Sequence, residues 1–122
     1  MSRLEGCRVL VVEDEFYLAK DVRETLAAEG AIILGPHPGN AAARTALGSD
    51  KPEVAVLDIN LGQGPDFSLA DELRASGVPI IFFTGYDQEV IPDRFADVPR
   101  LEKPTGTVRL VSVVAAACSR DR

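Results

Sequence analysis

The stretch that decides the fold is Val54-Ala55-Val56-Leu57-Asp58-Ile59-Asn60-Leu61. Apolar residues fill it up to a single acid, Asp58, and the glycine- and proline-containing segment 62–65 follows at once. Such a run predicts a buried strand, because strands that are covered on both faces are apolar without alternation. In open α/β sheets the functional groups lie beyond the carboxyl ends of the strands. The sequence therefore indicates Asp58 as the working residue.

Four other apolar runs predict the remaining strands, and segments with helical spacing separate them. Strands are predicted at 8–12, 31–34, 54–58, 79–84 and 98–101; helices are predicted at 16–29, 40–47, between Asp66 and Gly77, from about Pro92 (short or frayed) and at 107–119. Alternating strands and helices with short, right-handed connections give a parallel sheet covered on both faces. We therefore predict a flavodoxin-like, three-layer α/β sandwich. It has five parallel strands in the order 2-1-3-4-5 and five helices, as one domain spanning residues 1–122.

Composition narrows the possible partners and the compartment. The chain has 122 residues, of which 46% are hydrophobic and 6% aromatic, and its net charge is -6. An acidic chain with few aromatic residues is a poor match for nucleic acid or an anionic membrane. No stretch has the pattern of a signal peptide or a membrane span, so we expect a cytoplasmic protein. Cys7 and Cys118 lie near opposite ends, which predicts free, mostly buried thiols in a reducing compartment.

Polar residues follow the predicted strands at their carboxyl ends. Glu13 and Asp14 follow the first strand, and Asp58 ends the third. Each could be an ordinary helix-start or turn residue by itself. In the order 2-1-3-4-5, however, strands one and three are neighbours at the topological switch point, so the three acids should meet there. Carboxylates that share a crevice repel one another unless a cation neutralises them, and oxygen ligands select a hard ion such as Mg²⁺.

Two further strand ends face the same edge. Thr84 ends the fourth strand and Lys103 follows the fifth. Alone they would be an ordinary strand residue and a solvated lysine. Opposite three acids, a hydroxyl and an ammonium suit the oxygens of a phosphoryl group. The combination predicts a phosphoryl-transfer site with Asp58 as the acceptor.

The ordered motifs resemble a known family. Val-Glu-Asp-Glu at 12–15, Leu-Asp-Ile-Asn-Leu at 57–61, Phe-Thr-Gly at 83–85 and Glu-Lys-Pro at 102–104 are similar to the receiver domain of two-component response regulators, over essentially the whole chain. The likeness to stand-alone receivers implies a cytoplasmic signalling switch with no output domain in these residues. The resemblance further implies that the chain is a phosphoacceptor with slow autodephosphorylation and not an enzyme. The implied partners are a histidine kinase or a histidine phosphotransfer protein, and an unknown downstream protein, with no direct contact to nucleic acid or membrane.

The resemblance also implies a metal site. Mg²⁺, with Mn²⁺ as a second choice, would be held by Asp14, Asp58 and the backbone carbonyl of Asn60. Glu13 would act partly through water. These assignments follow from the family pattern and go beyond what spacing alone predicts.

Further roles follow from the resemblance. Lys103 would pair with one phosphoryl oxygen, and Thr84 would move to hydrogen-bond another. Pro104 implies a cis Lys-Pro peptide that would aim the lysine, since cis bonds are essentially confined to proline. Asn60 and Tyr86 occupy positions that tune the lifetime of the phosphoryl group in the family.

The chain departs from the family on the fifth strand. Many receivers carry an aromatic residue three positions before the lysine, where this chain has Arg100, and Thr105 stands where phenylalanine is common. A relay from threonine to an aromatic residue is therefore not expected. We hypothesise instead that switching works through ordering of the segment Gly85–Phe95.

Other functions stay open at this point. A metal-dependent hydrolase or phosphatase could use Asp58 as its nucleophile, although Asn60 supplies no second acid and no cap insertion is present. A flavin or nucleotide carrier could share the fold, although Glu13, Asp14 and Glu15 would repel phosphates after the first strand. The chain could also be a receiver that is never phosphorylated, or one domain of a longer protein.

Overall fold

The computed structural model describes residues 3–48, 51–59, 66–85, 91–103 and 106–120. The elements are, in order, β1 (Arg8–Val12), α1 (Phe16–Ala28), β2 (Ile32–His37), α2 (Asn40–Leu47), β3 (Val54–Asp58), α3 (Ser68–Ala75), β4 (Ile80–Thr84), the 3-10 turn η2 (Asp93–Phe95), β5 (Arg100–Glu102) and α4 (Thr107–Arg120). Each strand begins and ends close to where the apolar runs predict it.

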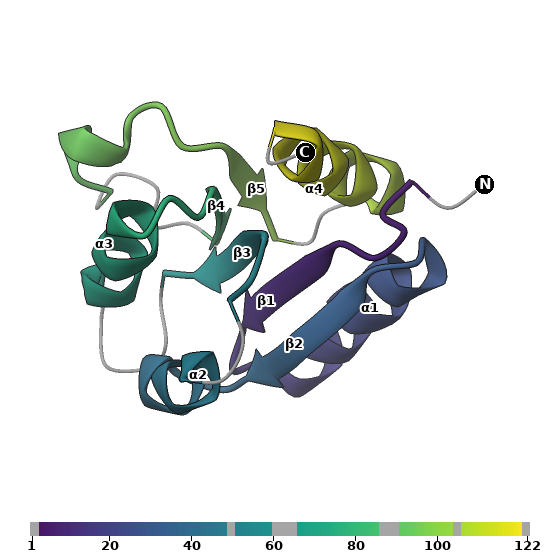
Figure 1. The fold of residues 1–122 in the computed structure, drawn as a ribbon, viewed down its shortest axis with the longest axis horizontal. Coiled ribbons are helices and arrows are strands. Elements are labelled where there is room, and N and C mark those ends of the chain that lie inside the picture. The colour runs from purple at the N-terminus through teal and green to yellow at the C-terminus, as the bar shows by residue number, and fades with distance from the viewer. Residues whose placement is uncertain (1–2, 49–50, 60–65, 86–90, 104–105, 121–122) are drawn as a thin grey trace.

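The five strands form one parallel sheet in the order β2-β1-β3-β4-β5, which confirms the predicted topology (Figure 1). The register brings the carboxyl ends of the strands to one edge. Val12 lies opposite Leu57, Asp58 lies opposite Phe83, and Thr84 lies opposite Glu102. Residues that follow β1, β3, β4 and β5 therefore share this edge of the sheet.

Helices cover both faces of the sheet. In β1, Val9 and Val11 belong to one buried cluster, and Leu10 and Val12 belong to the other, as the alternation of side chains along a strand requires. The first cluster includes buried residues of α1 and α4, and the second includes those of α2 and α3. Figure 1 shows these two helix pairs on opposite sides of the sheet.

Local signals explain the limits of α1, which begins directly after the three acids that follow β1. The side chain of Glu15 accepts hydrogen bonds from the backbone N–H groups of Tyr17 (3.3 Å) and Leu18 (2.9 Å), so it caps the helix. Gly30 ends the helix with φ of +93°, a left-handed conformation that favours glycine. A Cβ atom on Gly30 would also lie 2.9 Å from the Cα of Glu5.

The prediction of five helices is wrong: the described parts of the chain contain four α-helices. Where a short helix was expected from Pro92, the structure has only the turn η2. Pro92 and Pro99 limit the space, because proline lacks the N–H that a helix interior needs. Phe95 is fully buried in the second cluster and holds this turn against the sheet.

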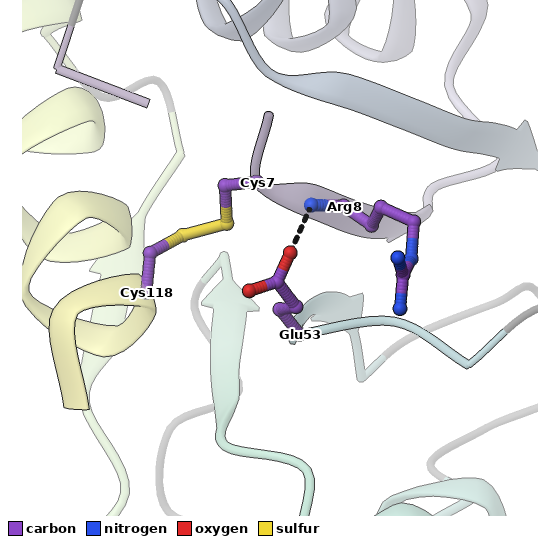
Figure 2. Close-up of a disulfide and its surroundings, with 4 residues drawn as sticks. All are labelled: Cys7, Arg8, Glu53 and Cys118. Atoms are coloured by element: carbon purple, nitrogen blue, oxygen red, sulfur yellow. Dashed lines mark hydrogen bonds between the residues drawn. A yellow bond between two sulfur atoms is a disulfide. The ribbon is translucent and has the colours of Figure 1, made fainter. Parts of the chain in front are cut away.

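The prediction of free thiols is also wrong. Cys7 and Cys118 form a disulfide although 111 positions separate them (Figure 2). Cys7 directly precedes β1, and Cys118 lies near the end of α4, which packs over the first cluster. Spacing rules for cysteines apply to closely spaced frameworks. They do not reveal that this fold brings Cys7 and Cys118 together.

Candidate functional site

Three carboxylates meet at the carboxyl edge of the sheet. Glu13 and Asp14 follow β1, and Asp58 is the last residue of β3. Each offers an oxygen that lies within 4.8 Å of those of the other two. Glu13 and Asp58 are buried, whereas Asp14 is exposed. The predicted acid cluster is therefore present, with one member open to solvent.

Lys103 bridges the two buried acids. Its Nζ lies 2.8 Å from Oε1 of Glu13 and 2.9 Å from Oδ2 of Asp58. The backbone N–H of Lys103 donates to the carbonyl of Thr84 (2.7 Å), which ties the end of β5 to the end of β4. The ammonium also lies 5.9 Å from the centre of the Phe83 ring. The lysine that sequence reasoning placed at this edge thus contacts the acids directly.

The electrostatics of the site follow from burial. The pKa of Glu13 is raised to about 7, chiefly by burial and also by the neighbouring Asp58, although hydrogen bonds from Lys103 and the backbone of Glu15 act to lower it. Burial lowers the pKa of Lys103, but its hydrogen bonds and charge interactions with Glu13 and Asp58 outweigh this, so the net pKa is raised. The single positive charge of Lys103 cannot neutralise the carboxylates of Glu13, Asp14 and Asp58 together. A bound cation would therefore be favourable at this site.

Thr84 ends β4 beside β3 and is fully buried. Its Oγ1 has no hydrogen-bond partner among the residues that the structure describes. A buried hydroxyl without a partner costs free energy and calls for an explanation. A ligand with oxygen acceptors at this edge would supply one, and the oxygen-only acid cluster suits Mg²⁺.

The structure describes only one of the remaining predicted site residues. Arg100 begins β5, is half-buried and lies opposite Phe82. The remaining predicted positions lie outside the described residues: Asn60, Tyr86, Pro104 and Thr105. Of the hypothesised switch segment, 86–90 also lie outside them.

The structure adds an aromatic pair that sequence reasoning missed. Phe16 and Tyr17, in the first turn of α1, are 70% and 73% exposed and meet edge to face with ring centroids 5.2 Å apart. Phe16 lines a pocket of about 390 Å³ together with Glu13 and Asp14. The signal was available, because both rings lie off the apolar stripe that starts at Leu18.

A doubly covered parallel sheet with this edge of acids, lysine and threonine is the arrangement of a signalling receiver. The family model of the response regulator receiver domain matches residues 9–115, so the chain belongs to this family. It is therefore a receiver domain of two-component signalling, and the comparisons give no support to a hydrolase. Among the described residues, no helix has the length and apolar character needed to cross a membrane.

Relatives agree with this assignment. The chain is 28% identical over 119 residues to the transcriptional regulatory protein PdtaR of Mycobacterium tuberculosis, covering 94% of this chain and 58% of that protein. It is 26% identical to the response regulator MprA of Mycobacterium ulcerans, covering 94% of this chain and 51% of that protein. The chain thus spans about half the length of these curated relatives.

Solved structures show the same fold. The solution structure of SdrG from Sphingomonas melonis Fr1 has a TM-score of 0.80 and 30% identity, and the match covers 96% of this chain and 98% of SdrG. The response regulator PhyR from Brucella abortus has a TM-score of 0.80 at 21% identity, covering 98% of this chain and 51% of PhyR. The second match shows likeness of fold alone.

Proposed function

We propose that this receiver accepts a phosphoryl group on Asp58 from the phosphohistidine of a histidine kinase or a histidine phosphotransfer protein. A carboxylate oxygen of Asp58 forms a bond to phosphorus while the P–N bond to the imidazole breaks, and the imidazole then takes up a proton. The observation that carries this proposal is the buried carboxylate of Asp58, which lies 2.9 Å from Lys103 within the acid cluster.

The acid cluster supports a metal requirement. Oxygens of Glu13, Asp14 and Asp58 form a hard donor set that fits Mg²⁺, and Mn²⁺ accepts the same donors. The backbone carbonyl of Asn60 is assigned to this site by the family pattern. When bound, the ion supplies positive charge that offsets the acids and the transferring group.

Lys103 and Thr84 would hold the transferred group. Lys103 would exchange its contact with Asp58 for a phosphoryl oxygen, to which an ammonium donates a strong, charge-assisted hydrogen bond. The partnerless hydroxyl of Thr84 would donate to another oxygen. Since the backbone N–H of Lys103 donates to the carbonyl of Thr84, a movement of one residue would displace the other.

We further propose that residues 1–122 form one receiver domain that acts in the cytoplasm, signals by binding a downstream protein and loses its phosphoryl group by slow autodephosphorylation. Pro104 would orient Lys103, and Asn60 and Tyr86 would set the phosphoryl lifetime. With Arg100 on β5, the output would depend on ordering of Gly85–Phe95. Amide hydrogen exchange with a phosphoryl mimic tests this; unchanged protection in that segment contradicts it.

The central test is phosphorylation by acetyl phosphate, with and without Mg²⁺, read by intact mass. Wild type and Asp58→Asn are compared side by side. We expect one phosphoryl adduct that needs Mg²⁺ and is absent from the variant. No adduct in the wild type would contradict phosphorylation, and an adduct in both proteins would place the acceptor elsewhere.

A further inference from the structure

The disulfide lies at the edge of the sheet opposite the acid cluster. Cys7 and Cys118 are 1% and 5% exposed. Between the two edges runs α4, which starts at Thr107, shortly after Lys103, and reaches past Cys118. At 1.5 Å per residue its length is roughly 20 Å. One helix therefore connects the phosphoryl-acceptor edge with the disulfide.

The two halves of α4 are held differently. Leu110, Val111 and Val114 bury branched side chains in the first cluster. Beyond them, the buried residues among the described side chains are Ala115, Ala117 and Cys118, all of which are small. Since stabilisation by burial scales with the apolar area removed from water, the last turns gain little from packing. Among the described side chains, the disulfide is thus the main restraint on this end of the helix.

The other side of the bond is fixed by backbone hydrogen bonds. The N–H of Cys7 donates to Leu4 (2.9 Å), and its carbonyl accepts from Ile32 (2.8 Å). Next to it, the N–H of Arg8 donates to the side chain of Glu53 (3.2 Å), as Figure 2 shows, and the N–H of Glu53 donates to the carbonyl of Arg8 (2.8 Å). If the bond opens, Cys118 is therefore the residue that moves.

We propose that Cys7 and Cys118 are a reversible dithiol–disulfide pair whose oxidation state decides whether the end of α4, from Ala115 to Arg120, is docked on the sheet. The reductant is a low-molecular-weight thiol. Its thiolate attacks one sulfur, the S–S bond breaks, and a second thiolate releases the mixed disulfide. Two electrons and two protons pass to Cys7 and Cys118, and the two molecules of the low-molecular-weight thiol are oxidised to their own disulfide. This goes beyond the proposed phosphoryl transfer and does not depend on it.

Burial of both sulfurs makes opening of the helix end a condition for exchange. A thiolate can reach neither sulfur while α4 is docked, so attack must follow local opening. Local opening is most accessible where buried apolar contacts are few, which is the alanine-rich end of α4. Disulfides that form in a compartment kept reducing by thiols are usually transient, which is consistent with a redox-sensing role for this bond.

The test compares the full chain after incubation with oxidised glutathione and after reduction with dithiothreitol. Thiol labelling in denaturant first reports the state of the bond. Hydrogen exchange at short labelling times then reports the helix end. On reduction we expect amides of 115–120 to exchange on the order of tenfold faster or more, while β1, β3 and β4 stay protected at those times.

Cys118→Ala is the matched variant, since alanine keeps helix propensity and adds no buried polar group. Without reductant it should exchange like the reduced wild type, and dithiothreitol should not change it. Free thiols after oxidation would overturn the proposal. So would unchanged protection of 115–120 on reduction, or loss of protection throughout the sheet at the same labelling times.

Discussion

The ammonium of Lys103 lies 2.9 Å from Oδ2 of Asp58 and also pairs with Glu13. Replacing Lys103 with Met would leave two buried carboxylates without their cation. Removing one partner of a buried ion pair is strongly destabilising, so we expect a loss of about 3 kcal/mol in the free energy of unfolding in EDTA. Urea unfolding measures this. Added Mg²⁺ should restore part of the loss, and equal stability of both proteins in EDTA would contradict the pairing.

Glu13 should make the stability of the metal-free protein depend on pH. Burial raises its pKa to about 7 in the folded state, from 4.5. The folded protein therefore holds this proton more tightly than the unfolded chain does, and stability falls as pH rises through about 4.5 to 7. Urea unfolding in EDTA at both ends of this window should show wild type losing stability relative to Glu13→Gln. A constant difference between the two proteins would refute the assignment.

Asp14 is the exposed member of the acid cluster, and Asp14→Asn should weaken Mg²⁺ binding. We expect the Mg²⁺ affinity to fall on the order of tenfold or more. Changes to residues that only support the ligands already cost this much, so the loss of a ligand charge should cost at least as much. Thermal unfolding at rising Mg²⁺ concentration reports the affinity, since a ligand of the folded state raises the midpoint. Asp21→Asn, an exposed acid on α1, is the matched control and should bind like wild type. Equal Mg²⁺ dependence of Asp14→Asn and wild type would place the ion elsewhere.

Phe95 should contribute more to stability than the ion pairs around it. Its ring is fully buried, 5.2 Å from the ring of Phe82, so Phe95→Ala should cost about 3–5 kcal/mol in urea unfolding. The neighbouring Arg94 pairs with Asp71 on the surface (2.9 Å), and exposed pairs are worth little. Arg94→Ala is therefore expected to unfold almost like wild type. Comparable losses in the two variants would contradict this ranking.

Much of the fold and site could be predicted because both depend on local pattern. Apolar runs mark buried strands, and parallel pairing then carries Glu13, Asp58 and Thr84 to one edge whatever the details of the loops. Lys103 reaches the same edge by this logic, because it directly follows β5. In each case, a residue that lies at the carboxyl end of its own strand also lies at the carboxyl edge of the sheet.

The features that escaped prediction depend on contacts between distant parts of the chain. Cys7 and Cys118 pair because α4 packs across the start of β1, and nothing near either cysteine encodes this. The turn at Asp93–Phe95 replaces a helix because two prolines limit its length and a buried ring anchors it. The exposure of Phe16 and Tyr17 is different, because their place off the apolar stripe of α1 could have been seen in the helical spacing of the sequence.

The bond between Cys7 and Cys118 also changes how the domain would respond to mechanical force. Tension applied to the chain before Cys7 and after Cys118 would pass directly from one sulfur to the other. The sheet and its acid cluster lie inside the covalent ring that this bond closes, so they would carry almost none of the load. In the oxidised form, the receiver would not lengthen under tension. Only after reduction would pulling on its ends begin to unfold the sheet.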